Sequence, residues 1–340
     1  MSTLSRRDFI PLIGGAIASL PLLSLQSMPT SDVKLQAPKA LGKGDCIGLC
    51  APAGKVKSEK EIIEFEDILH RLGFITKRAT NTTNKYGYFA GTDEERAEGF
   101  MNLIQDHEVR AVFFIRGGWG CARLLPLLNF TTIAKNPKII MGFSDATTLL
   151  TAIAVKSRLI TFHGPSGNST WNDYSVKYVE ELLVKKSIVT YTNKKEDSPI
   201  RTYSKGQAKG VLFGGNLSVI VSLIGSGYLP DWNGKILFLE DVKEEPYSID
   251  RMLMQLKLNG VFDKVNGIIL GNFRKCNAEE PEHSFTLEEV FENYFLNQKV
   301  PVFYGAQIGH TLNKFTLPVG ADALMNANNG TLKLLRPAVN

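Results

Sequence analysis

An alternation of short strand-like segments with longer amphipathic ones, starting at Asp45, constrains the fold of this chain more than any other feature. Segments typical of strands recur at 46–52, 74–79, 109–115, 138–143 and 159–165. Between them, helical periodicity predicts helices at 58–73, 92–106, 121–128 and 145–156. Strands that alternate with helices at this spacing form a parallel sheet covered on both faces, so we expect an α/β fold.

The second half of the chain continues this alternation with more strand and more turns. After a polar, irregular segment at 171–206, expected as a linker, strand patterns return in "GVLFGGN", "KILFLEDV" and "VNGIILGNF". The sequence therefore predicts an N-terminal parallel-sheet domain of the flavodoxin-like or Rossmann-like kind at 40–170. A C-terminal α/β domain richer in strand is expected at 207–340. Sites in such sheets form beyond the carboxyl ends of the strands, and we expect the active site between the two domains.

Composition narrows the class of protein. Apolar residues make up 44% and charged residues 21% of the 340 positions, as in a globular protein. The formal net charge is +5 and no basic run is interleaved with aromatics, so no nucleic-acid partner is expected. No His, Cys, Asp and Glu residues have metal-ligand spacing, so neither a metal nor another cofactor is expected. The cysteines are expected as buried free thiols, with disulfides as the alternative in an oxidising compartment.

Residues 1–31 have the pattern of an export signal. The pair Arg6-Arg7 stands in "SRRDFI", which resembles a twin-arginine signal, and a long uncharged stretch follows. The alternative is a membrane anchor, which Gly14-Gly15 and three prolines in this stretch disfavour. We therefore expect a periplasmic or otherwise exported protein with no stable membrane span after processing.

A single serine stands where a predicted strand gives way to a helix within two residues. In "KIIMGFSDATTLL" the apolar run ends at Gly142-Phe143 and the helix follows from Ala146, which leaves Ser144 and Asp145 on the corner. Such a corner exposes the hydroxyl and directs unpaired helix amides toward it, as in a nucleophile elbow. The alternative is a serine that only caps the helix.

An activated serine needs a base, and the base needs an acid that orients it. Among five histidines, His163 in "TFHGP" and His310 in "QIGHTLNKFTLPVG" follow apolar strands and are placed to line a cleft. Glu240 ends the apolar run "KILFLE", where a carboxylate has to be solvated or paired. Both halves of the chain thus contain candidates for the groups that an activated serine needs.

With these motifs, the chain resembles the LD-carboxypeptidases of serine peptidase family S66, which includes muramoyltetrapeptide carboxypeptidase and the microcin C self-immunity hydrolase. The resemblance runs from about Gly44 to the end and rests on motifs in the right order: "GDCIGLCAPAG", "FFIRGGWGCARLLPLL", "IMGFSDATTLL", "FHGP", "GVLFGGNLSVI", "ILFLEDVKEEPYSIDRMLMQL" and "GHTLNKFTLPVGADA". It implies Ser144 as nucleophile, His310 as general base and Glu240 as the acid that orients the histidine.

Other residues of these motifs have two interpretations each. The turn "GGWG" after the third strand resembles a phosphate-binding turn but lacks the P-loop lysine. The resemblance implies instead that the amides of Gly118 and Asp145 form an oxyanion hole. Trp119 is expected to lie in the cleft or in the core. Gly215 and Asn216 are expected as a tight turn with a helix cap, or as residues that line the substrate.

The resemblance implies a metal-free serine carboxypeptidase that hydrolyses the amide between the L-centre of a diamino acid and the terminal D-alanine of murein tetrapeptides. The substrate is then a small peptide, and a homodimer is one expected assembly. A first alternative keeps the triad but hydrolyses a peptide-nucleotide antibiotic or another acyl-amide. A second is a non-catalytic exported peptide-binding protein, which would need none of Ser144, Glu240 and His310. The sequence does not identify the group that holds the terminal carboxylate.

Overall fold

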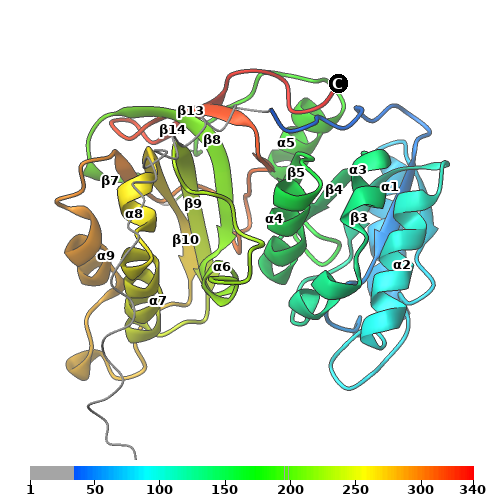
Figure 1. Ribbon diagram of the computed structural model, residues 1–340, viewed down its shortest axis with the longest axis horizontal. Helices are drawn as coiled ribbons and strands as arrows, with labels where there is room; N and C mark the ends of the chain where they lie inside the picture. Colours follow the sequence, from blue (N-terminus) through cyan, green and yellow to red (C-terminus); the bar gives the residue numbers. More distant parts are fainter. Residues whose placement is uncertain (1–33, 195, 198) are drawn as a thin grey trace, which may run out of the picture. The chain divides into compact units, whose positions relative to one another are not determined.

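The computed structural model describes residues 34–194, 196–197 and 199–340. The expected export signal at 1–31 lies outside these residues. From Leu35 to Asn340 the chain forms one compact unit that contains two sheets and their covering helices (Figure 1). In the part of the chain that is described, no helix has the length and apolar character needed to cross a membrane.

The N-terminal sheet has the strand order β12-β5-β4-β3-β1-β2. Parallel pairing joins β1 (Cys46–Cys50), β2 (Ile75–Arg78), β3 (Val109–Phe114), β4 (Ile139–Gly142) and β5 (Thr161–His163). The edge strand β12 (Leu317–Val319) comes from the far end of the chain and pairs antiparallel with β5. The predicted α/β fold with a parallel N-terminal sheet is confirmed, and the antiparallel edge is an addition that only tertiary pairing creates.

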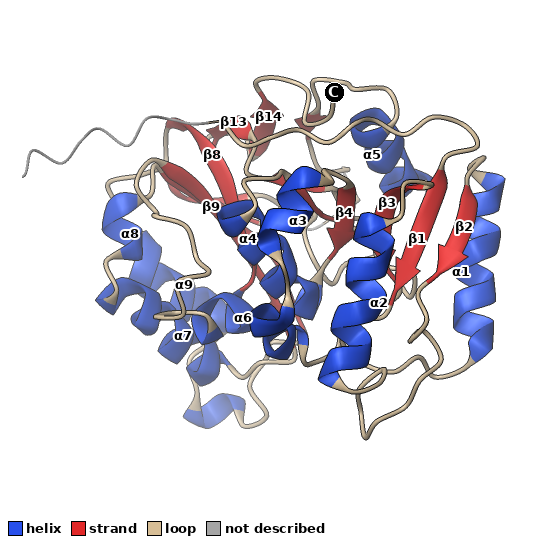
Figure 2. Ribbon diagram, turned by 45° about the vertical axis from the view of Figure 1, so that its right-hand side comes forward, coloured by secondary structure: helices blue, strands red, loops and turns tan. Residues whose placement is uncertain are grey.

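Helices cover both faces of this sheet (Figure 2). They are α1 (Glu59–Arg71), α2 (Asp93–Gln105), α3 (Phe130–Lys135), α4 (Thr147–Lys156) and α5 (Asp173–Leu183). Phe113 of β3 belongs to the same core cluster as side chains of α1 and α5, whereas the next residue, Phe114, packs with side chains of α2, α3 and α4. Successive strand residues point to opposite faces, which explains why β3 is almost continuously apolar.

The C-terminal sheet is mixed and has the order β6-β14-β13-β8-β9-β10-β11-β7. Its parallel centre consists of β8 (Gln207–Asn216), β9 (Lys235–Val242), β10 (Gly267–Arg274) and β11 (Val302–Tyr304). Antiparallel strands flank this centre: β6 (Thr190–Tyr191), β7 (Arg201–Ser204), β13 (Asp322–Asn326) and β14 (Thr331–Leu334). The helices of this domain are α6 (Leu217–Ser222), α7 (Pro246–Leu258), α8 (Val261–Lys264) and α9 (Leu287–Phe295). The predicted strand-rich second domain is confirmed.

The segment 171–206, expected as a linker, contains regular structure. The side chain of Asn172 caps α5 by accepting a hydrogen bond from the amide of Ser175, and α5 buries Tyr178 and Leu182 in the core. The same segment supplies β6 and β7, which form the two edges of the C-terminal sheet. Edge strands and half-exposed helices need few apolar residues, so their polar composition resembles that of a loop.

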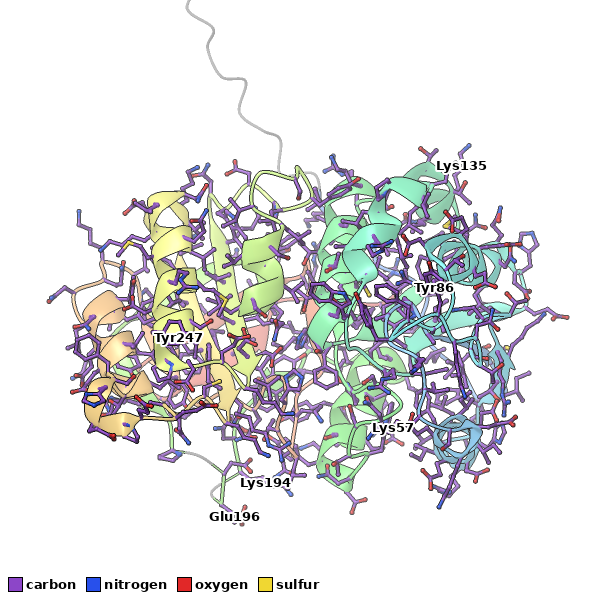
Figure 3. The ribbon with its side chains drawn as sticks, turned by 90° about the horizontal axis from the view of Figure 1, so that it is seen from below. Lys57, Tyr86, Lys135, Lys194, Glu196 and Tyr247 are labelled. Carbon is purple, nitrogen blue, oxygen red and sulfur yellow. The ribbon has the colours of Figure 1, made fainter. Side chains whose placement is uncertain are left out.

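The predicted functional residues follow the carboxyl ends of strands from both sheets. Ser144 comes after β4, the glycine turn after β3, and His310 after β11, while Glu240 lies near the end of β9. In the view from below, Lys57 appears on the N-terminal domain and Tyr247 on the C-terminal domain (Figure 3). Parallel strands in each sheet thus direct loops of both domains toward a shared region.

Candidate active site

The corner at Ser144 is a strained strand-to-helix turn. Ser144 has φ 63°, in the left-handed region that side chains with a Cβ rarely adopt. A short 3₁₀ turn, Ser144–Ala146, connects β4 directly to α4. The hydroxyl forms no hydrogen bond with any described residue, and the side chain is partly exposed. A serine held in this way has the geometry of a nucleophile elbow, which the cap-only alternative would not need.

The glycine turn after β3 packs directly on this serine. A Cβ atom added at Gly117 would lie 2.9 Å from the Cβ of Ser144, so only glycine fits there without displacement. Gly118 follows with φ 117°. The buried carboxylate of Asp145 accepts a hydrogen bond of 2.8 Å from the amide of Cys121, which fastens the far end of the turn. Burial raises the pKa of Asp145, and this hydrogen bond opposes the rise.

Glu240 and His310 form a close pair in the C-terminal domain. Nδ1 of His310 donates a hydrogen bond of 2.7 Å to Oε2 of Glu240, whose side chain is fully buried. Burial alone would raise the pKa of Glu240, but the hydrogen bond and charge of His310 hold it below its ordinary value. An ionised acceptor on Nδ1 fixes the tautomer in which Nε2 of His310 carries the free lone pair.

A glycine permits this pairing. Gly309 has φ 85°, and a Cβ at this position would collide with Oε2 of Glu240. On the other side of the carboxylate, a Cβ at Gly271 of β10 would lie 3.3 Å from the Cβ of Glu240. The backbone therefore encloses the carboxylate closely and presents the next residue, His310, to its oxygen.

Aromatic packing connects the serine to the histidine. The ring of Phe143, the residue before Ser144, lies against the ring of His310 with 4.8 Å between centroids. Since Phe143 belongs to the N-terminal domain and His310 to the C-terminal domain, the two domains meet at the site. The structure thus pairs the selected histidine with the selected carboxylate and packs the residue before the selected serine against that histidine.

A second histidine and a lysine lie beside the pair. Nε2 of His163 is 3.9 Å from Oε1 of Glu240, and neither atom has a hydrogen-bond partner among the described residues. Burial lowers the pKa of His163 to about 4, against the attraction of Glu240, so this imidazole is neutral near pH 7. Lys314 is buried, with 4% of its surface exposed, and its Nζ lies 5.3 Å from the centre of the Phe143 ring. Burial lowers the pKa of Lys314 to about 8, and the charge of Glu240 opposes this effect.

Gly215 and Asn216 join the two domains. A Cβ at Gly215 would lie 2.5 Å from the side chain of Thr147 in α4, and the amide of Asn216 donates to Oγ1 of Thr147 at 3.1 Å. The side chain of Asn216 caps α6 through the amide of Val219 and donates to Asp241. Both residues are buried. The expected helix cap at Asn216 is present, both residues lie at the domain interface, and the substrate-lining interpretation stays a prediction.

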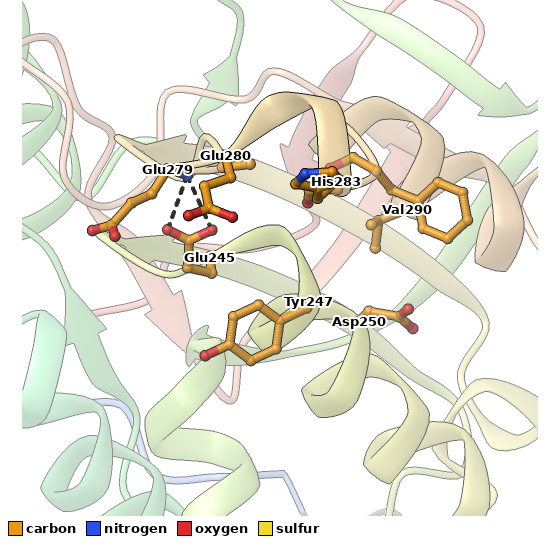
Figure 4. A pocket seen from close by; sticks show the side chains of 10 residues that line it. Glu245, Tyr247, Asp250, Glu279, Glu280, His283 and Val290 are labelled. Atoms are coloured by element: carbon orange, nitrogen blue, oxygen red, sulfur yellow. Dashed lines mark hydrogen bonds between the residues drawn. The ribbon is translucent and has the colours of Figure 1, made fainter.

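Trp119 lies on the surface rather than in the core. It is 62% exposed and lines a cavity of about 810 Å³ together with Gly118. A further cavity, of about 760 Å³, lies in the C-terminal domain between acidic side chains (Figure 4). There the carboxylate of Glu245 accepts hydrogen bonds from the amide of Glu279. This acidic cavity includes none of the residues selected from the sequence.

The sequence analysis missed three features of the site. Lys314 is the one charged residue in the run 307–321, and a lone lysine in an uncharged stretch is a signal that a buried cation leaves. For Asp145 the sequence analysis predicts a role only for the backbone amide, whereas the structure shows that its carboxylate also binds the amide of Cys121. The glycine at position 309 had no signal, since its need arises from Glu240, which is distant in sequence.

The remaining sequence predictions concern the cysteines and metal binding. Each of Cys46, Cys50, Cys121 and Cys276 is buried and free, as predicted. Among the described residues, no group of three or more His, Cys, Asp or Glu side chains is arranged to hold a metal ion. The site presents a partly exposed serine on a strained turn, and the residue before it packs against a histidine that is paired with a buried carboxylate. These are the parts of a serine hydrolase.

Comparison with known proteins identifies the family. A model described as the LD-carboxypeptidase N-terminal domain matches residues 47–164, and one described as the LD-carboxypeptidase C-terminal domain matches residues 209–325. The chain is 39% identical over 301 residues to the probable murein peptide carboxypeptidase of Bacillus subtilis (strain 168), covering 86% of this chain and 92% of that protein. It is 32% identical over 348 residues to the microcin C7 self-immunity protein MccF of Escherichia coli, covering 92% and 97%.

A solved structure supports the same assignment. The crystal structure of muramoyltetrapeptide carboxypeptidase from Oxalobacter formigenes superimposes with a TM-score of 0.75 at 28% identity, covering 85% of this chain and 97% of that one. The chain therefore belongs to the LD-carboxypeptidase family, peptidase family S66, a family of serine hydrolases.

Proposed function

We propose that this protein is a serine LD-carboxypeptidase that removes the terminal D-alanine from murein tetrapeptides by cleaving its amide bond to the L-centre of a diamino acid. The observation that carries the proposal is the 2.7 Å hydrogen bond between His310 and the buried Glu240, next to Ser144 on its strained turn. The names of murein peptide carboxypeptidases among its relatives support the choice of substrate.

In the proposed mechanism, Nε2 of His310 takes the proton of Ser144 as the hydroxyl oxygen attacks the scissile carbonyl carbon. The amides of Gly118 and Asp145 stabilise the oxyanion of the tetrahedral intermediate. Collapse of the intermediate breaks the C–N bond, and His310 passes the proton to the departing amine of D-alanine.

Water then completes the cycle. His310 removes a proton from a water molecule, whose oxygen attacks the acyl-enzyme, and the second tetrahedral intermediate releases the shortened peptide and the serine hydroxyl. Throughout, Glu240 holds the imidazole in its reactive tautomer and balances the charge of the imidazolium.

The decisive experiment compares two synthetic tetrapeptides that differ only in the configuration of the last Cα. With the carbonyl held by the oxyanion donors, inversion of this centre moves the reacting atoms out of line, and a displacement of about 1 Å costs roughly 100-fold in rate. We expect alanine release from the D-terminal peptide and at least that preference over the L-terminal one. Equal rates would overturn the LD-specific function and leave a serine hydrolase of other specificity.

A second candidate function is hydrolysis of a peptide-nucleotide or related acyl-amide, favoured by the 32% identity to a microcin C7 self-immunity protein over 92% of this chain. Incubation with an aminoacyl sulfamoyl adenosine distinguishes the two candidates, since only the second predicts release of its amino acid.

Location and assembly complete the proposal. The twin-arginine-like segment around Arg6-Arg7 supports export, so we propose that the protein acts on wall peptides in the periplasm. A homodimer is proposed on the family resemblance. Fractionation of expressing cells and sedimentation of the purified protein test these two points.

A further inference from the structure

The cavity beside the glycine turn has an unusual set of charges. It has a volume of about 810 Å³ and is lined by Gly54, Lys55, Val56, Lys57, Lys85, Tyr88, Arg116, Gly118 and Trp119. These residues come from three segments: the loop after β1, the loop before α2, and the turn after β3. The lining contains several cations and no carboxylate.

The cavity borders the proposed catalytic centre. Gly118, whose amide is a proposed oxyanion donor, forms part of its wall. The amide of Gly54 donates to the carbonyl of Gly117 at 3.3 Å, and Gly117 in turn packs on Ser144. Gly118 is therefore the residue shared by the cavity and the proposed oxyanion hole, and a substrate acyl group attacked by Ser144 would reach the cavity by extending over the glycine turn.

The cations in the wall are not neutralised by the protein. Among the described residues, no carboxylate lies within ion-pair distance of the side-chain nitrogens of Lys55, Lys57, Lys85 or Arg116. Glu61 accepts a hydrogen bond from the backbone amide of Lys57 but forms no ion pair with the side chains of these four residues. Clustered like charges without counter-ions repel one another, so a bound anion would lower their energy.

Two further features indicate a built binding surface. Arg116 is held by a 2.8 Å hydrogen bond from Nη1 to the carbonyl of Lys55, while its buried Nε has no partner among the described residues. Tyr88 and Trp119 are each 62% exposed on the cavity wall. Exposed aromatic faces next to a fixed arginine and several lysines suit a ligand with an apolar body and anionic groups.

We propose that this cavity is the subsite for the acyl side of the substrate and recognises a peptide carboxylate remote from the scissile bond. This inference rests on the proposed function. A volume of about 810 Å³ exceeds what the single departing D-alanine requires and is in the usual range for drug-sized ligands, so it fits the larger, acyl part of the peptide. Several cations likewise exceed what one terminal carboxylate needs.

The test uses two tetrapeptides with terminal D-alanine that differ in one group. One has a γ-linked glutamate with a free α-carboxylate, and the other has the α-carboxamide at the same position. For the unsubstituted protein we expect kcat/KM to be about tenfold higher for the carboxylate form, the size of a charge-assisted hydrogen bond. The preference should shrink as NaCl is raised, because salt screens exposed charges.

The double variant Lys57→Gln, Lys85→Gln should lose this preference through a higher KM for the carboxylate form, with kcat nearly unchanged. The double variant Lys135→Gln, Lys209→Gln is the matched control: it removes two charges of the same kind from exposed positions on α3 and β8, outside the cavity (Lys135 is labelled in Figure 3). It should keep the full preference. Loss of the preference in both variants would mean a general charge effect and would overturn the subsite.

Binding measurements separate failure of the subsite from failure of the proposed function. Calorimetric titration of the Ser144→Ala protein with both peptides needs no turnover. Tighter binding of the carboxylate form supports the subsite even if neither peptide is cleaved. Equal binding overturns it even if both peptides release D-alanine, and stronger binding of adenosine monophosphate than of either peptide would assign the cavity to a nucleotide.

Discussion

The two domains hold their reactive groups by different physical means. The N-terminal domain positions Ser144 with backbone strain, at φ 63° between β4 and α4. The C-terminal domain positions His310 with a side-chain hydrogen bond to a fully buried carboxylate, Glu240. Strain presents an atom at an exact place, whereas a buried charge pair fixes a tautomer and a protonation state. The comparison indicates that variants of the two domains should lose activity for different reasons.

The largest effect is expected from Ser144→Ala. Loss of the nucleophile should lower kcat by roughly 10⁵-fold while substrate binding persists, because the residue acts only in bond making. His310→Ala should be about as severe. Circular dichroism and thermal unfolding check that both variants fold. Near-normal alanine release from either variant would contradict the proposed triad.

Glu240→Gln should follow, with a loss of roughly 10⁴-fold in kcat. The amide keeps the shape of the side chain but cannot balance the imidazolium, and it can turn its NH₂ toward Nδ1 and select the wrong tautomer. The matched variant Asp241→Asn changes the neighbouring buried acid, which accepts a hydrogen bond from the amide of Ser218 in α6, whereas the hydrogen bond of His310 goes to Glu240. If both substitutions reduce kcat equally, the effect of Glu240 is structural.

Substitution of one glycine in each domain should have a smaller effect on kcat than the loss of a triad residue. Gly117→Ala pushes on Ser144, and Gly309→Ala pushes on Glu240, so each should cost about 100-fold in kcat through displacement near 1 Å. Gly225→Ala is the control, since Gly225 has φ 83° but open space around its Cβ position. It should lower the free energy of unfolding by about 1 kcal/mol and leave kcat unchanged. A kcat loss at Gly225 equal to the others would show general strain sensitivity.

His163 should make stability depend on pH. Its pKa is about 4 in the fold and about 6.5 when unfolded, so the unfolded chain binds more protons between these values. The contribution to stability is present above pH 6.5 and is lost as the pH falls toward 4, by at most about 1.4 kcal/mol per pH unit. Burial raises the pKa of Asp241 to about 6, which opposes this slope in the acid range.

Urea unfolding of the parent and of His163→Gln at pH 5 and pH 7 isolates the histidine, because Asp241 remains in both proteins. The parent should lose more stability between these pH values than the variant does. Identical pH slopes would mean that His163 is not buried in its neutral form.

The smallest effect is expected from EDTA. Since no metal-ligating cluster occurs among the described residues, kcat for alanine release should change by less than about twofold. Loss of activity in EDTA, with recovery on addition of zinc, would contradict the proposed metal-free mechanism.

Much of the fold could be predicted because its signals are local. The alternation of apolar and amphipathic segments depends on residues within one element, and it located the strands and helices around Ser144. The segment 171–206 has the composition of a linker although it contains β6 and β7, because edge strands gain their stability from a neighbouring strand, here β14 and β11, and not from their own composition. The position of β12 in the N-terminal sheet was unpredictable for the same reason.

The sequence by itself determined the strand-to-helix corner at Ser144, since backbone geometry there follows from adjacent residues. Family motifs added Glu240 and His310 as candidates, but their 2.7 Å contact spans 70 positions and exists only because β9 and the loop after β11 converge on one edge. The tertiary structure alone decided that Gly215 and Asn216 join the domains and that Lys55, Lys57, Lys85 and Arg116 share a cavity. Burial and charge repulsion depend on neighbours in space, and chain order does not encode these directly.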